Sequence, residues 1–92
     1  MRDDKFYQRA DQHIQLSNNQ ISKDIPVGSI SASMMYSTAR FNAWMEAYTC
    51  TSGIEMKIKK DETVEYFVEE YRKMLLENLD DYIEKFDSYM KE

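Results

Sequence analysis

The sequence has very few of the residues that most often build chemical sites. Its 92 residues include one cysteine, one histidine, two glycines and one proline. The single cysteine, Cys50, excludes an internal disulfide and a metal cluster held by thiolates. Two isolated glycines exclude a glycine-rich phosphate-binding loop. The only histidine, His13, has no carboxylate or second histidine one helical turn away with which to share a metal. We therefore expect no cofactor and no metal.

Long apolar runs are missing as well. No stretch approaches the 18 or so consecutive apolar residues that a membrane span requires. The polar segment 1–5 is not followed by an apolar segment, so we expect no signal peptide. A lone cysteine fits a reducing compartment. Together these features predict a cytoplasmic protein.

Positive charge is scarce in the last third of the chain. The net charge of the chain is −5. Residues 1–60 carry +2, whereas residues 61–92 carry −7, with eleven Asp/Glu against four Lys/Arg. Phosphate backbones and anionic lipid both require concentrated Lys/Arg. We therefore expect neither nucleic acid nor a membrane among the partners.

What the sequence does have is apolar side chains at helical spacing. After Gly53 the chain contains neither glycine nor proline. Steps of three and four residues separate its principal apolar positions, which predicts one long amphipathic helix. These positions are Val64, Val68, Tyr71, Leu75, Leu79, Tyr82, Phe86 and Met90.

This helix is too long for the chain that carries it. Residues 61–90 alone would span about 45 Å at about 1.5 Å per residue. A compact globule of this size has a diameter of about 30 Å. The apolar stripe should therefore extend beyond what one folded copy can cover. This predicts a homodimer of C2 symmetry. An unidentified protein partner is also possible. The candidate interface consists of Leu79, Tyr82, Ile83, Phe86, Tyr89 and Met90.

The chain is predicted to be a single all-α domain, residues 1–92, with three helices. The expected helices cover about 4–22, 29–50 and 53–90. The first has one apolar stripe. The second is apolar on two sides, one with large and one with small side chains, which is typical of a central helix.

Polar residues mark the expected helix starts. Asp3 or Asp4 can cap the first helix, and Ser29 the second. Ser52 and Glu55 have the spacing of a capping box, which would start the third helix near Gly53. Alternating apolar and charged residues at 54–59 also fit a short strand. Helix is favoured because a lone strand has nothing to pair with.

No catalytic set is recognisable. Carboxylates four residues apart are abundant in the third helix, but most lie opposite its apolar stripe, which indicates a solvated acidic face. The Glu-x-x-His element of di-iron bundles is absent. Cys50 has no activating group near it in the sequence.

Arg40 is the residue most suggestive of a binding site. It falls among the small side chains of the second helix, beside Tyr36 and near Trp44. An arginine on a half-buried face must be paired or bound to something. One interpretation is an ion pair with an acid of the first or third helix. The other is that Arg40, with Tyr36 and Trp44, anchors an anionic ligand or partner group through its planar guanidinium.

Three segments together resemble a known family. They are residues 6–11 with Ile14, residues 31–33 leading to 39–43, and residues 65–67 continuing through 71–75 to 77–82. In these segments the chain resembles family 3144 of the domains of unknown function, short acidic helical proteins mostly from proteobacteria. The resemblance covers nearly the whole chain. It implies a helical fold and a bacterial origin, and it implies no activity.

The sequence favours a non-catalytic interaction module that acts as a homo-oligomer. Two other classes stay open. The chain could be a small-ligand-binding protein or small enzyme with a pocket around Arg40. It could also be an acidic inhibitor that mimics nucleic acid through the acidic face of its third helix.

Overall fold

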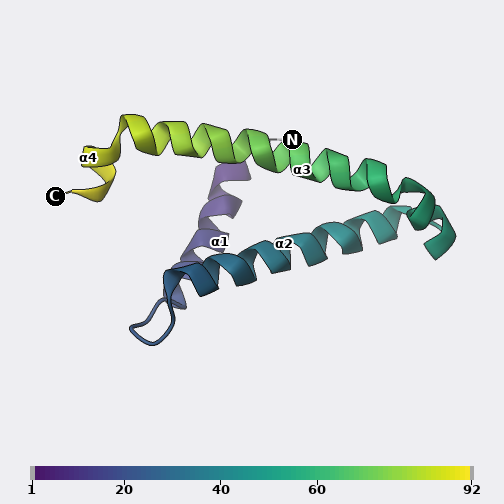
Figure 1. Cartoon of the computed structure of the whole chain (residues 1–92), viewed down its shortest axis with the longest axis horizontal. Coiled ribbons are helices and arrows are strands. Elements are labelled where there is room, and N and C mark those ends of the chain that lie inside the picture. The colour runs from purple at the N-terminus through teal and green to yellow at the C-terminus, as the bar shows by residue number, and fades with distance from the viewer. Residues whose placement is uncertain (1, 92) are drawn as a thin grey trace. The chain divides into compact units, whose positions relative to one another are not determined.

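The structure is a computed structural model that describes residues 2–91, and its regular elements are all α-helices. The predicted all-α class is therefore confirmed. No helix in the described range is both long enough and apolar enough to cross a membrane. In chain order the helices are α1 (Phe6–Asn19), α2 (Val27–Thr49), α3 (Gly53–Glu84) and α4 (Phe86–Met90) (Figure 1).

The chain divides into two compact units, one ending at Met45 and the other beginning at Glu46. The first unit holds α1 and most of α2. The second holds the last turn of α2, then α3 and α4. That both units belong to one domain stays a prediction.

The start of α1 differs from the expected cap. Lys5 is the N-cap residue, and its side chain makes no capping hydrogen bond. Asp3 instead accepts from the Lys5 amide at 2.9 Å and from the Arg9 guanidinium at 2.6 Å. The Arg9 hydrogen bond, followed by the bond from the Lys5 amide, lowers the pKa of Asp3 to about 2. The capping role predicted for Asp3 or Asp4 is therefore wrong, because Asp3 closes a turn ahead of the helix.

The α1–α2 connection explains why the end of α1 and the start of α2 differ from their predicted positions. α1 ends at Asn19 because the chain then enters a tight loop, in which the Ile25 amide donates to the Ser22 carbonyl at 3.3 Å. α2 begins at Val27 and not at Ser29, since proline's fixed φ suits the residue at a helix start. The Pro26 carbonyl accepts from the Ser29 amide at 3.0 Å.

Within the described residues, Ile30 on α2 is the one buried apolar side chain, at 6% exposure. The two apolar sides predicted for the second helix are thus largely open in the first unit.

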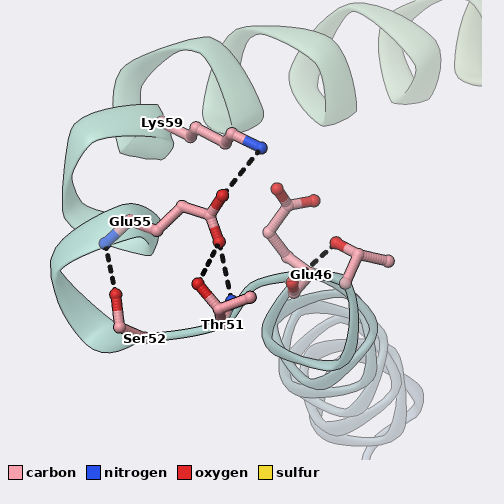
Figure 2. Close-up of polar contacts among 6 residues, drawn as sticks. Glu46, Thr51, Ser52, Glu55 and Lys59 are labelled. Carbon is pink, nitrogen blue, oxygen red and sulfur yellow. Dashed lines mark hydrogen bonds and ion pairs between the residues drawn. The ribbon is translucent and has the colours of Figure 1, made fainter.

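The α2–α3 turn is held by the predicted cap (Figure 2). Ser52 Oγ accepts from the Glu55 amide at 3.1 Å, which satisfies one free N–H of the first turn of α3. In a capping box the Glu55 carboxylate would accept from the amide of the N-cap residue, Ser52. It accepts instead from the amide of Thr51, one residue earlier, at 2.6 Å. This bond lowers the pKa of Glu55. Residues 54–58 are helical, so the strand alternative is wrong.

α3 runs without interruption for 32 residues, about 48 Å at the helical rise. The predicted end at residue 90 is wrong. The backbone leaves helical geometry at Lys85, with φ −110° and ψ 25°, and the five-residue helix α4 follows.

Candidate functional site

The six residues predicted as an interface lie together at the end of the second unit. We call them the C-terminal apolar surface. Leu79, Tyr82 and Ile83 are on the last turns of α3, and the other three are on α4. All six are exposed, from 46% for Tyr89 to 74% for Ile83. An exposed cluster of large apolar side chains is a feature of binding surfaces. The full set is Leu79, Tyr82, Ile83, Phe86, Tyr89 and Met90.

α4 packs against the end of α3 through a polar contact that we call the Asp81 clasp. The Tyr89 hydroxyl donates to Asp81 Oδ2 at 2.9 Å, and Lys85 Nζ lies 3.2 Å from Asp81 Oδ1. The Tyr82 and Tyr89 rings meet at a centroid distance of 4.8 Å. Eight residues of straight helix rise about 12 Å, so the bend at Lys85 is what brings Tyr89 close to Asp81.

The clasp changes the titration of its members. The hydrogen bond from Tyr89, followed by that from Lys85, lowers the pKa of Asp81. The same bond raises the pKa of Tyr89, because it is made by the protonated phenol. The neighbouring carboxylate raises the pKa of Lys85. The clasp is thus complete when Asp81 is ionised and Tyr89 is neutral.

The bend also divides the apolar stripe. The sequence predicted one stripe through Met90, but the stripe on α3 stops at Glu84. Lys91 is the C-cap residue of α4, and its ammonium lies 5.9 Å from the centre of the Phe86 ring. The C-terminal apolar surface thus combines exposed apolar side chains with charged groups beside them.

The second predicted site lies on α2. Tyr36, Arg40 and Trp44 follow each other at four-residue intervals on one side of the helix. They line a shallow, open hollow together with three neighbours, Ser37, Phe41 and Ala43. The rings of Phe41 and Trp44 are 5.4 Å apart. The structure therefore brings the three predicted residues together.

The exposure of this hollow differs from expectation. Tyr36 is 68% exposed and Trp44 57% exposed, and Arg40 is also exposed and not half-buried. Of the two interpretations of Arg40, the ion pair with the first helix is not seen: in the described part of the first unit Arg40 has no acidic partner. A guanidinium that shares a hollow with aromatic side chains can receive an anion that also carries a flat apolar group.

Across residues 2–91 no three His, Cys, Asp or Glu side chains gather closely enough to hold a metal ion. The acidic face of α3 is partly neutralised within the helix. Arg72 lies 3.6 Å from Glu69, and Lys73 lies 3.2 Å from Glu70.

The sequence did not predict the clasp, in which Asp81 pairs with Lys85 and accepts from the Tyr89 hydroxyl. Asp81 and Lys85 are four residues apart, and this spacing is the usual signal of a helical ion pair. The contact of Asp81 with Tyr89, eight residues away, could not be predicted, because a straight helix would hold these two residues far apart.

Comparisons with known proteins agree with the resemblance seen in the sequence. The model of the family described as "Protein of unknown function (DUF3144)" matches residues 6–83. The NMR structure of the protein NB7890A from Shewanella sp is 40% identical to this chain, with a TM-score of 0.77. The likeness covers 96% of this chain and 93% of that one. No curated protein matches.

Proposed function

The chain belongs to the DUF3144 family of proteins of unknown function, and from its uncovered C-terminal apolar surface we propose that it is a non-catalytic interaction module that acts as a homodimer. In this dimer the C-terminal apolar surfaces of two copies bury each other across a twofold axis. A twofold arrangement is the commonest for soluble homo-oligomers.

The length of α3 is the observation that carries this proposal. α2 has 23 residues and is joined to α3 by only three, Cys50 to Ser52. Helix α2 therefore reaches about 35 Å from the turn, whereas α3 reaches about 48 Å. However the two units are oriented, α2 cannot cover α3 beyond about residue 75. The C-terminal apolar surface begins at Leu79.

α1 is too short and too narrow in its apolar stripe to cover the rest of the apolar side of α3. It has 14 residues, about 21 Å, and only one apolar stripe. The apolar residues of α3 occupy about half of its circumference, which is wider than the stripe of about 100° that faces a single neighbour. One side of α3 would still face water if α1 lay along the other. A second copy supplies a matching apolar surface of the right length.

Charge does not oppose the pairing. The carboxylates of α3 lie mostly on the arc opposite the apolar stripe, and some are already paired with Arg72 and Lys73. They can stay in water when two stripes meet, so a net charge of −5 per copy costs little at physiological ionic strength, where charges more than about 8 Å apart are largely screened.

Sedimentation equilibrium over nanomolar to high micromolar concentrations tests the proposal. We expect the mass to rise with concentration from 11.0 kDa toward twice that value. A mass that stays at one copy throughout would refute the homodimer. Assembly that stops at a higher order would refute the twofold pairing.

The hollow on α2 supports a second candidate function, the binding of an anionic ligand. Arg40 would take the negative group and Tyr36 with Trp44 the flat part. A thermal-shift screen of aromatic carboxylates and nucleotides, with Arg40→Gln beside the wild type, tests this candidate. A stabilising compound whose effect is lost in Arg40→Gln but kept in Arg72→Gln would support it, and no stabilising compound would refute it for these classes.

A further inference from the structure

At Lys85 the spacing of the side chains predicts a continuous helix, but the backbone is not helical. Apolar positions keep helical spacing across this residue, as a straight helix requires. The backbone nevertheless leaves the helix there, although neither glycine nor proline is present. A sharp bend in a helical sequence needs an identifiable cause. The positions in question are Leu79, Tyr82, Phe86 and Met90.

The bend leaves part of the backbone without helical partners. Within the described chain, the amides of Phe86, Asp87 and Ser88 donate to no backbone carbonyl. The amides on either side do donate: Lys85 to Asp81 and Tyr89 to Lys85, both at 3.0 Å. A straight helix would pair all three open amides with the carbonyls four residues earlier.

The Asp81 clasp is the compensating interaction. The Asp81 carboxylate accepts a hydrogen bond from the Tyr89 hydroxyl at 2.9 Å and lies 3.2 Å from the Lys85 ammonium. The Tyr82 and Tyr89 rings add their contact at 4.8 Å. A straight arrangement of the same segment would lose the clasp and would gain three backbone hydrogen bonds and an unbroken stripe.

We propose that α4 is a two-position segment, clasped by Asp81 when the chain is alone and straight, continuous with α3, when a second copy covers the C-terminal apolar surface. This inference rests on the proposed homodimer. Straightening lengthens the stripe by about six residues, or about 9 Å. Apolar burial against the second copy then favours the straight position, since a partner shifts the equilibrium toward the state that it binds better.

Tyr89→Phe tests the switch by removing the clasp hydroxyl while keeping the ring. In this proposal only chains in the straight position form the dimer. Each dimer takes two such chains, so its apparent dissociation constant falls with the square of the straight fraction. Losing one hydrogen bond should raise the straight fraction about threefold, so the dimer should tighten by up to about tenfold. Tyr66→Phe is the matched control, because it removes a hydroxyl from the polar side of α3 and should leave the dissociation constant unchanged.

Amide hydrogen exchange of the wild type gives a direct readout. Below the dissociation constant, the amides of 86–88 should exchange fast. Above it, they should slow by at least about tenfold as they gain backbone acceptors. The amides of Lys85 and Tyr89 donate in both positions, so they serve as internal references.

The outcomes separate the two proposals. A wild type that dimerises without slowing amides 86–88, or a Tyr89→Phe variant with unchanged affinity, would overturn the switch and leave the homodimer intact. A wild type that stays at 11.0 kDa at every concentration would overturn the homodimer and the switch together. Slowed exchange together with tighter Tyr89→Phe association would support both.

Discussion

Leu79→Glu probes the proposed interface at its first residue. Leu79 is 49% exposed in the single chain, so about half of its side chain is available for burial by a second copy. Full burial of a leucine is worth about 1.5–3 kcal/mol, which makes the available half worth about 1 kcal/mol. Twofold symmetry repeats the residue, so the leucine-to-glutamate change removes about 2 kcal/mol per dimer.

The introduced carboxylate adds a second cost. Leaving a polar group unpaired in an interface costs about 1–3 kcal/mol, and here two carboxylates lie on facing surfaces. We therefore expect the dissociation constant of Leu79→Glu to rise by at least about 100-fold. Glutamate and leucine have similar helix propensities, so α3 should keep its helicity.

Sedimentation equilibrium measures this change, and circular dichroism at 222 nm checks the helix. Tyr66→Glu is the matched control. It also adds one negative charge to an exposed position of α3, at 59% exposure, but on the polar side of the helix. The reasoning would be refuted if Leu79→Glu dimerised as tightly as the wild type. It would also be refuted if both variants weakened the dimer equally, because the effect would then be one of net charge.

Three further predictions concern the local contacts. Ser52→Ala removes the cap of α3 and should lower the free energy of unfolding by about 1 kcal/mol in urea titrations; an unchanged midpoint would contradict the capping role seen in Figure 2. Arg9→Ala should return the pKa of Asp3 from about 2 toward 3.8 in a carboxyl NMR titration, whereas a pKa that stays low would show that the Arg9 hydrogen bond is not its cause. The Asp81 clasp should weaken on acidification. Because the pKa of Asp81 is lowered in the clasp, the stabilisation is present above the ordinary aspartate value of about 4 and is lost as pH falls through the lowered one. The Tyr82–Tyr89 ring contacts in NOE spectra should fade over that range, and contacts that persist well below it would contradict this assignment.

Much of the helical architecture could be predicted from the sequence. The spacing of apolar residues after Gly53 identified the long helix α3, and the Ser52–Glu55 spacing identified its start. These predictions succeeded because both depend on interactions within one or two turns of chain. The same holds for the grouping of Tyr36, Arg40 and Trp44, since a four-residue spacing on a helix places side chains on one side.

The predictions that failed depended on competition between local contacts. Asp3 is a good N-cap residue by type, but the Arg9 guanidinium and the Lys5 amide take its carboxylate. The helix was expected to continue to residue 90 because nothing in the sequence interrupts it. The bend at Lys85 goes together with a contact between residues eight apart, and helical periodicity does not encode a contact at that separation. The exposure of Arg40 depends on what packs over α2, and spacing along one helix carries no information about that.

Isotope-filtered NOE spectroscopy tests the central claim most directly. In a sample that mixes labelled and unlabelled wild-type chains, the filtered NOEs arise only between copies. We predict such NOEs from the methyl groups of Leu79 and Ile83 to the same region of the second copy. Cross-copy NOEs confined to α1 or α2, or none at concentrations far above any dissociation constant, would contradict an interface formed by the C-terminal apolar surface.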